Sequence, residues 1–259
     1  MAQGKLVVVG TGIHAVGHLT MEASAWIRQA QRVYYVVADQ VTEAAIQRLN
    51  PAAQSLSDLY GDGQPRADTY AGMAERILAG VRAGFLTCAV FYGHPGVFVA
   101  PAHAAIRQAR AEGYEAALLP GISAEDCLFA DLDLDPALEG CQTYEATDFL
   151  MRPRVIDPSS ALVLWQIGVL GEWTYQRDGY ALTAMPLLLE RLGRDYELEH
   201  VAIVYEAAVY PGCAPRIEHV PLAQLPATPL SAISTLYLPP IRAATPDLEV
   251  CRRLGIEVR

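Results

Sequence analysis

A repeated alternation of strand and helix patterns over residues 1–120 constrains the fold of this chain more than any other sequence feature. Short apolar or β-branched runs, typical of buried strands, occur at residues 6–9, 33–37, 86–91 and 114–119. Segments with helical patterns lie between them, at 20–32, 42–49, 66–82 and 97–111. Because parallel strands need crossover connections, the alternation predicts an α/β fold with a mostly parallel sheet and helices on both faces.

Beyond Pro120-Gly121 the pattern becomes more mixed. Further strands are expected at 161–167, 201–205, 216–220 and 231–238, and further helices at 123–130, 186–192 and 247–254. Several of these strands resemble those of antiparallel sheets. We therefore expect two α/β lobes, 1–120 and 121–259, with a mostly parallel sheet in the first, a mixed sheet in the second, and a ligand between them.

Composition and charge exclude several classes of protein. Hydrophobic residues make up 52% and charged residues 19% of the chain, which predicts a well-packed globular protein. The net charge of -10 repels phosphate backbones, so no nucleic-acid partner is expected. The most apolar region, 86–102, is interrupted by glycine and proline, and the run 6–9 is too short for a signal peptide. Neither a membrane span nor secretion is indicated.

Cysteine and histidine spacing gives no sign of a metal site. The five cysteines contain no CxxC pair, and their odd number fits reduced thiols in a cytoplasmic protein. His14 and His18 stand four apart, as two metal ligands can, but no third ligand lies near them in sequence. We therefore interpret them as surface or cleft histidines and expect no bound metal.

The first glycine motif allows two interpretations. Gly10-Thr11-Gly12 with Ala15 fits G-x-G-x-x-A after a strand, and Asp39 follows the second strand, so an NAD-dependent oxidoreductase is an alternative. However, the helix start signal is Thr20, whereas the dinucleotide fingerprint needs a helix that begins within the motif. We favour a glycine-lined turn over a binding cleft.

A second glycine motif, Tyr92–Phe98 (YGHPGVF), ends one predicted strand and opens a helix. Gly93 and Gly96 allow the backbone to turn sharply and to approach a ligand, and Pro95 stiffens the loop. Amide groups at the start of the following helix can bind an acceptor group. Taken alone, this loop predicts only a ligand-binding turn.

Three motifs in a fixed order extend that interpretation. Gly10–Gly12 comes first, Tyr92–Phe98 second, and Pro120–Ala124 (PGISA) third. This order resembles the tetrapyrrole methylase superfamily, whose two-lobed methyltransferases bind S-adenosylmethionine between their lobes. Most members of that superfamily carry Asp at the position of His94, so the match is closer to one of its subgroups.

That subgroup is the borosin-type peptide backbone α-N-methyltransferases, which the chain resembles over nearly its whole length. The matching segments include Arg66-x-x-Thr69-Tyr70 and the residues 49–51, 59–60, 92–98, 120–126, 131–136, 140–142, 145–147, 164–167, 234–235 and 238–240. The resemblance implies iterative methylation of main-chain amide nitrogens in a ribosomally made precursor peptide.

Arg66 and Tyr70 are the leading candidates for catalysis. A peptide nitrogen is a poor nucleophile because its lone pair is delocalised, so methylation needs a base and a stabiliser for charge on the carbonyl oxygen. The two residues are four apart on one face of a predicted helix, where the guanidinium can favour the phenolate. Their spacing alone also fits a surface pair. The resemblance implies that Tyr70 is the base, Arg66 its partner, and Tyr60 and Tyr92 hydrogen-bonding participants.

The resemblance also implies a set of residues that bind the cofactor S-adenosylmethionine. They come from the second glycine motif, the segment after Pro120 and the second lobe. They are Tyr92, His94, Val97, Phe98, Ser123, Ala124, Gln166, Tyr205, Ala207, Ser234 and Thr235.

The expected partner is a precursor peptide supplied in trans. In fused borosin enzymes the core peptide is the C-terminal tail, whereas residues 241–259 here include Asp, Glu and Arg and form no long apolar segment. A homodimer is expected, with a heterotetramer if two precursor chains bind. The alternatives are a methyltransferase for a tetrapyrrole or other small molecule, the oxidoreductase, and a non-catalytic peptide-binding module.

Overall fold

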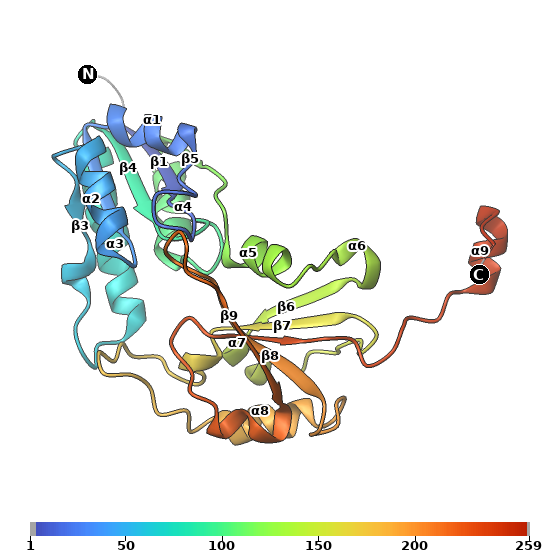
Figure 1. The fold of residues 1–259 in the computed structure, drawn as a ribbon. Helices are drawn as coiled ribbons and strands as arrows, with labels where there is room; N and C mark the ends of the chain where they lie inside the picture. The colour runs from blue at the N-terminus through green and yellow to red at the C-terminus, as the bar shows by residue number, and fades with distance from the viewer. Residues whose placement is uncertain (1–3, 258–259) are drawn as a thin grey trace. The chain divides into compact units, whose positions relative to one another are not determined.

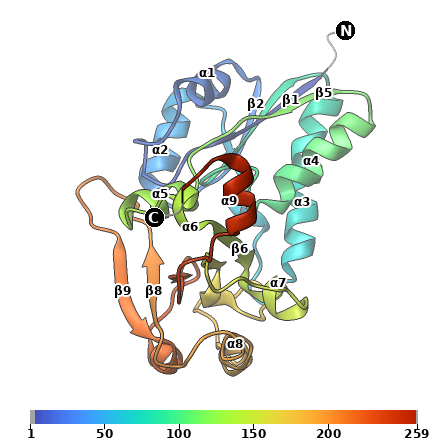
Figure 2. The same ribbon diagram turned by 90° about the vertical axis from the view of Figure 1, so that its right-hand side faces the viewer.

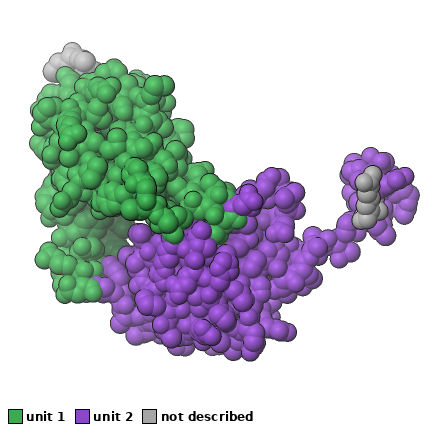
Figure 3. Space-filling view, viewed as in Figure 1, with its two compact units in different colours: residues 1–132, 173–178, 207–215 green, residues 133–172, 179–206, 216–259 purple. Residues whose placement is uncertain are grey.

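The computed structural model describes residues 4–257, which form two compact units (Figures 1 and 3). Unit 1 contains residues 4–132 together with 173–178 and 207–215. Unit 2 contains the other described residues, 133–172, 179–206 and 216–257. This division differs from the expected boundary after residue 120, because the next helix and two later segments of chain pack with unit 1.

The described part of unit 1 contains a five-stranded parallel sheet. Its strand order is β3-β2-β4-β1-β5. The strands are β1 (Lys5–Gly10), β2 (Arg32–Val36), β3 (Gln54–Ser55), β4 (Leu86–Phe91) and β5 (Glu115–Leu118). The four predicted strands and their parallel pairing are confirmed, and the two-residue β3 is an addition at the edge of the sheet.

Helices cover both faces of this sheet. Successive side chains of β1 point to opposite faces and so contact different helices. Val7 and Val9 pack with Ile27 and Ile46 of α1 (Met21–Gln29) and α2 (Gln40–Leu49). Leu6 and Val8 pack on the other face, against α3 (Arg66–Arg82) and α4 (Ala100–Ala111). Figure 2 shows α3 and α4 side by side. The elements η1 (Ser57–Leu59) and α5 (Ala124–Asp131) complete the unit.

The helix α4 begins at Ala100, three residues after the predicted start at Val97. The reason lies in the backbone of Phe98, whose φ of 55° is left-handed and interrupts a right-handed helix. Pro101 stands within the first turn, where its missing N–H costs nothing.

The described part of unit 2 contains a mixed five-stranded sheet in the order β6-β7-β10-β8-β9. Its strands are β6 (Cys141–Glu145), β7 (Ala161–Trp165), β8 (Val201–Glu206), β9 (Arg216–Pro221) and β10 (Thr235–Leu238). Only β6 and β7 are parallel to each other, and the remaining pairs are antiparallel. The predicted mixed sheet is confirmed, although β6 was missed and β10 begins four residues later than expected.

One face of this second sheet carries the core of unit 2. Phe149 and Leu188 pack there against Leu164, Val204 and Leu236. The helices are α6 (Pro136–Glu139), α7 (Ala146–Met151), η2 (Ile167–Val169), α8 (Met185–Leu192), η3 (Leu222–Ala227) and α9 (Leu248–Leu254). Within residues 4–257 no helix has both the length and the apolar character needed to cross a bilayer.

Candidate functional site

The three glycine motifs meet at the carboxyl edge of the parallel sheet in unit 1. β1, β4 and β5 all end at this edge, where ligands of open α/β sheets bind. Gly12 and Gly93 exchange backbone hydrogen bonds of 3.2 and 3.0 Å. A Cβ atom on Gly10 would lie 2.1 Å from the carbonyl oxygen of Gly93, and one on Gly121 would lie 3.2 Å from the same oxygen. Three sequence-distant motifs therefore share one backbone contact.

The loop Tyr92–Phe98 is held by hydrogen bonds within unit 1. Nδ1 of His94 accepts the amide proton of Gly96 at 2.9 Å, and Nε2 of His103 lies 2.9 Å from the Gly96 carbonyl oxygen. Phe98 has the left-handed backbone noted above, yet its ring is half-exposed. Such strain in a bulky residue is typical of ligand-binding loops. The loop thus presents an apolar ring from a fixed backbone.

Tyr92 is the first residue of this loop, and its phenol resists ionisation. Its backbone N–H donates to the Val36 carbonyl at 3.0 Å. Burial, with the nearby Cys127 and Asp39, raises the pKa of Tyr92 to about 12. Near neutral pH the phenol therefore keeps its proton, which makes it a hydrogen-bond donor rather than a base.

The structure brings Arg66, Tyr70 and Tyr60 to the start of α3. Arg66 is the first residue of the helix, and Tyr70 follows one turn later on the same side. Tyr60 directly follows η1, and both tyrosines are half-buried against the core that α3 shares with the sheet. The hydroxyl of Thr69 lies 3.5 Å from the Leu59 carbonyl, which links the helix to η1. The predicted helix over 66–82 is confirmed, and the roles of Arg66 and Tyr70 stay predictions.

A segment that the sequence did not single out lies beside these residues. Residues 173–178 form a short antiparallel ribbon with residues 62–66. The N–H of Arg66 donates to the Trp173 carbonyl at 3.0 Å. The rings of Tyr60 and Tyr175 are in contact, with centroids 4.9 Å apart and planes tilted by 41°. In the sequence this segment is marked by Trp173 and Tyr175, two aromatic residues two positions apart. A pattern of two residues is too short to predict a strand.

Ser123 and Ala124 lie at the start of α5, also in unit 1. The Ser123 hydroxyl donates to Asp126 Oδ2 at 2.7 Å and accepts from the Asp126 N–H at 3.2 Å, a capping box. The Ser123 side chain is buried, and it acts as the N-cap of α5. Ala124 is the first helical residue.

The remaining predicted cofactor residues are divided between the two units. In unit 2, Thr235 pairs with Tyr205 across β10 and β8. Gln166 follows β7 with a left-handed φ of 62°, and the next N–H donates to the Ser234 carbonyl at 3.1 Å. Because β10 runs antiparallel to both neighbours, these four residues share one edge of the sheet. Ala207 belongs instead to the 207–215 segment of unit 1.

The Ser234 side chain is held by a carboxylate within unit 2. Its hydroxyl and that of Ser231 both donate to Glu206, which also accepts from Arg216 at 3.1 Å. Burial alone would raise the pKa of Glu206, but the two hydroxyl bonds and the Arg216 charge together lower it. The carboxylate therefore stays ionised and fixes the turn before β10.

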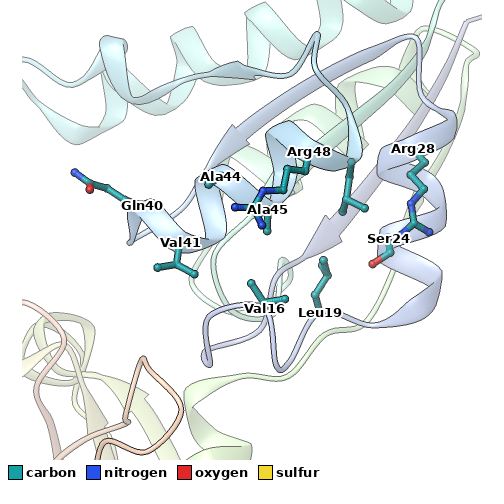
Figure 4. A pocket seen from close by; sticks show the side chains of 10 residues that line it. Val16, Leu19, Ser24, Arg28, Gln40, Val41, Ala44, Ala45 and Arg48 are labelled. Carbon is teal, nitrogen blue, oxygen red and sulfur yellow. The ribbon is translucent and has the colours of Figure 1, made fainter.

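A separate groove lies between α1 and α2 (Figure 4). It encloses about 500 Å³, and none of the predicted site residues lines it. Its lining residues are Val16, Leu19, Ser24, Arg28, Gln40, Val41, Ala44, Ala45, Arg48 and Leu49.

Solved structures of other proteins share this fold. Uroporphyrin-III-C-methyltransferase from Thermus thermophilus superposes with a TM-score of 0.65 at 19% identity, covering 99% of this chain and 98% of that one. Diphthine synthase gives a TM-score of 0.60 at 14% identity, covering 97% and 96%. A further structure of the Thermus enzyme, complexed with S-adenyl homocysteine, gives 0.62 at 16%, covering 91% and 92%. The predicted two-lobed, tetrapyrrole-methylase-like α/β fold is confirmed.

Curated relatives are much more similar in sequence. The Gymnopus fusipes "methyltransferase/ribosomally synthesized cyclic peptide gymnopeptides precursor" is 43% identical over 98% of this chain and 61% of its own length. The omphalotin A counterpart from Omphalotus olearius is 42% identical over 98% and 62%. A type III borosin precursor from Anomoporia bombycina is 46% identical over 98% and 30%. This chain thus spans less than two thirds of each of these relatives.

A family model provides the classification. The model described as Tetrapyrrole (Corrin/Porphyrin) Methylases matches residues 5–224, a stretch that includes all three glycine motifs and the start of α3. The chain therefore belongs to the tetrapyrrole methylase family.

Proposed function

We propose that this protein is an S-adenosylmethionine-dependent methyltransferase that methylates backbone amide nitrogens of a ribosomally made precursor peptide, as a borosin-type enzyme working iteratively. The family and the names of relatives more than 40% identical over nearly the whole chain support this function. The gathering of Arg66, Tyr70 and Tyr60 at the start of α3 is the observation that carries it.

The glycine contact fits the proposed cofactor. A Cβ atom on Gly10 or Gly121 would crowd the Gly93 carbonyl oxygen, so glycine is what lets the three loops proposed to hold the ligand come this close together. The half-exposed Phe98 offers an apolar surface. The backbone N–H groups of Ala124 and its neighbours lie at the start of α5. The bound sulfonium would supply an electrophilic methyl group. In this proposal His94 and Val97 support the same loop.

The proposed cofactor set also includes residues outside that loop. These are Ser123 beside Ala124, Ala207 in the later segment of unit 1, and four residues on the edge of the unit 2 sheet, Gln166, Tyr205, Ser234 and Thr235. Polar and apolar groups mix in this set, as they do in sites for nucleoside ligands.

The chemistry divides among four side chains. Tyr70 takes the amide proton, so that the nitrogen lone pair becomes available for methyl transfer. Arg66 favours the Tyr70 phenolate and stabilises the imidate-like charge on the carbonyl oxygen. Tyr92, whose pKa is raised to about 12, stays protonated and donates a hydrogen bond, and Tyr60 is the second donor.

Tyr70→Phe is the central test of this function. It removes the base but keeps the ring, so methylation of a precursor peptide should be lost while binding of S-adenosylhomocysteine is unchanged. Mass spectrometry detects about 14 Da for each methyl that replaces the hydrogen of a planar amide. Tyr114→Phe, at the opposite edge of the sheet, is the matched control and should keep full activity.

The same assay distinguishes the alternatives. The family description favours a porphyrinoid substrate as the second candidate, and methylation of a porphyrinoid without any peptide product would establish it. Peptide binding with no turnover in either the parent protein or Tyr70→Phe would indicate a peptide-binding module. An NAD-dependent oxidoreductase fits poorly because α1 begins at Met21, well after Gly12. Calorimetry should show binding of S-adenosylhomocysteine and none of NAD.

The form of the precursor and the oligomeric state stay predictions. The relatives' names join methyltransferase and precursor, whereas we expect a separate precursor, a homodimer or heterotetramer, and a cytoplasmic location. Two features of the seven-residue α9 support an assembly. It exposes Leu248 and Leu254, and a helix this short is marginally stable by itself, so contact with another chain would stabilise it. Light scattering with and without a peptide added in trans measures the assembly, and methylation of that peptide tests the separate precursor.

A further inference from the structure

The ribbon formed by residues 173–178 and 62–66 carries aromatic rings beside the proposed catalytic residues. Three backbone hydrogen bonds of 2.8 to 3.0 Å connect the two strands of the ribbon. The side chain of Asp62 accepts a fourth, from the Arg177 N–H at 3.0 Å. The main chain of Trp173 and Tyr175 is therefore fixed within unit 1 next to Tyr60 and Arg66.

Strand geometry places Trp173 and Tyr175 on one face of this ribbon. Successive side chains of a strand alternate between faces. Thr174 and Gln176 share the other face, since the Gln176 amide donates to the Thr174 hydroxyl at 2.9 Å. Because Thr174 pairs with Pro65, Trp173 stands opposite Arg66 in the register. Because Tyr175 contacts Tyr60, Trp173 lies on the same face of the ribbon as Tyr60.

The exposure of Trp173 is unusual for a large aromatic residue. Its side chain is 63% exposed although its backbone is hydrogen-bonded. By contrast, Trp165 is buried and Trp26 is half-buried. Exposed tryptophans on a fixed backbone supply large contact areas to a ligand at little cost in side-chain entropy.

We propose that Trp173, next to the paired rings of Tyr60 and Tyr175, forms an aromatic subsite that binds an apolar side chain of the peptide substrate beside the amide being methylated. Trp173 is the specificity residue, because its indole is exposed and its carbonyl accepts the Arg66 N–H. Tyr175 is a positioning residue that orients the Tyr60 ring. This inference rests on the proposed peptide substrate and adds the selection of its side chains.

Two synthetic peptides of equal length test the subsite, one with valine and isoleucine in its core and one with serine at those positions. In Trp173→Ala, KM for the apolar peptide should rise roughly tenfold, as expected for loss of one aromatic contact. The kcat should change less than about twofold, since the methyl-transfer groups remain. KM for the serine peptide should not change, and Trp173→Phe should restore most of the preference.

Controls separate this inference from the proposed function. Met21→Ala removes a large side chain that is 91% exposed at the start of α1, and it should leave both KM values unchanged. Tyr175→Ala should lower kcat for both peptides, whereas Tyr175→Phe should retain it because the ring that contacts Tyr60 is kept. S-adenosylhomocysteine affinity should be constant throughout.

Binding of the fluorescein-labelled apolar peptide provides a second readout that needs no turnover. Weaker binding to Trp173→Ala than to the parent protein supports the subsite. Equal dissociation constants, or an equal loss of kcat for both peptides at constant KM, would overturn it. Absence of peptide methylation by the parent protein would instead overturn the proposed function, together with the roles that depend on it.

Discussion

At the scale of single residues, the Tyr92 phenol links burial to pH. Burial, Cys127 and Asp39 raise its pKa from 10.0 to about 12, so the folded state favours the protonated phenol. Its contribution to the free energy of unfolding is fully present below pH 10, the unfolded value, and is lost as the pH rises through about 12.

Tyr92→Phe tests this linkage because it keeps the ring and removes the proton. Between about pH 8 and about pH 11 the urea midpoint of the parent protein should fall further than that of the variant, since only the parent must retain this neutral phenol. Equal falls in the two proteins would contradict the shifted pKa.

The glycine contact makes a second prediction at residue scale. Gly10→Ala would place a Cβ atom 2.1 Å from the Gly93 carbonyl oxygen, so the loops must separate. We expect a loss of roughly 1–3 kcal/mol of stability, as for other overpacked sites, together with weaker binding of S-adenosylhomocysteine. Gly17→Ala in the same loop meets no atom closer than 3.6 Å and should change neither the melting temperature nor the affinity.

At the scale of elements, the start of α5 depends on its capping box. Ser123→Ala removes both hydroxyl bonds to Asp126 and should cost about 1 kcal/mol of stability. Ser57→Ala is the control, because that exposed serine is the first residue of η1 and not its N-cap. Urea unfolding of both variants measures the difference. An equal loss in the two would show that the hydroxyl of Ser123 serves another purpose.

Elements with strong local patterns could be predicted, whereas those set by distant contacts could not. The face shared by Arg66 and Tyr70 follows from helical spacing alone, and four strands of unit 1, β1, β2, β4 and β5, follow from short apolar runs. In contrast, Phe98 adopts a left-handed backbone that its residue type disfavours. The extended segment at Trp173 is held by hydrogen bonds to residues 62–66, which are far away in the sequence. Ser234 likewise meets Glu206 only through the pairing of β8 with β10.

At the scale of the whole molecule, the two units have separate hydrophobic cores. Ile77 is fully buried in unit 1, and Leu164 is fully buried in unit 2. Ile77→Ala and Leu164→Ala should each cost roughly 2–5 kcal/mol in the unit that holds the new cavity. Native-state hydrogen exchange should therefore show loss of protection mainly in the substituted unit, and each variant is the control for the other. Equal loss in both units would indicate that the two cores unfold together.

The composition of unit 1 from three stretches of chain affects its biosynthesis. The amino end of a polypeptide leaves the ribosome first, so domains usually fold in order from the amino end. Here the partner of residues 62–66 emerges only with Trp173, and the unit is complete only at Pro215. By then β6, β7 and β8 of unit 2 have already been translated. During synthesis the amino-terminal part of unit 1 therefore cannot complete its fold, and residues 62–66 lack their partner segment, until much of unit 2 has been translated.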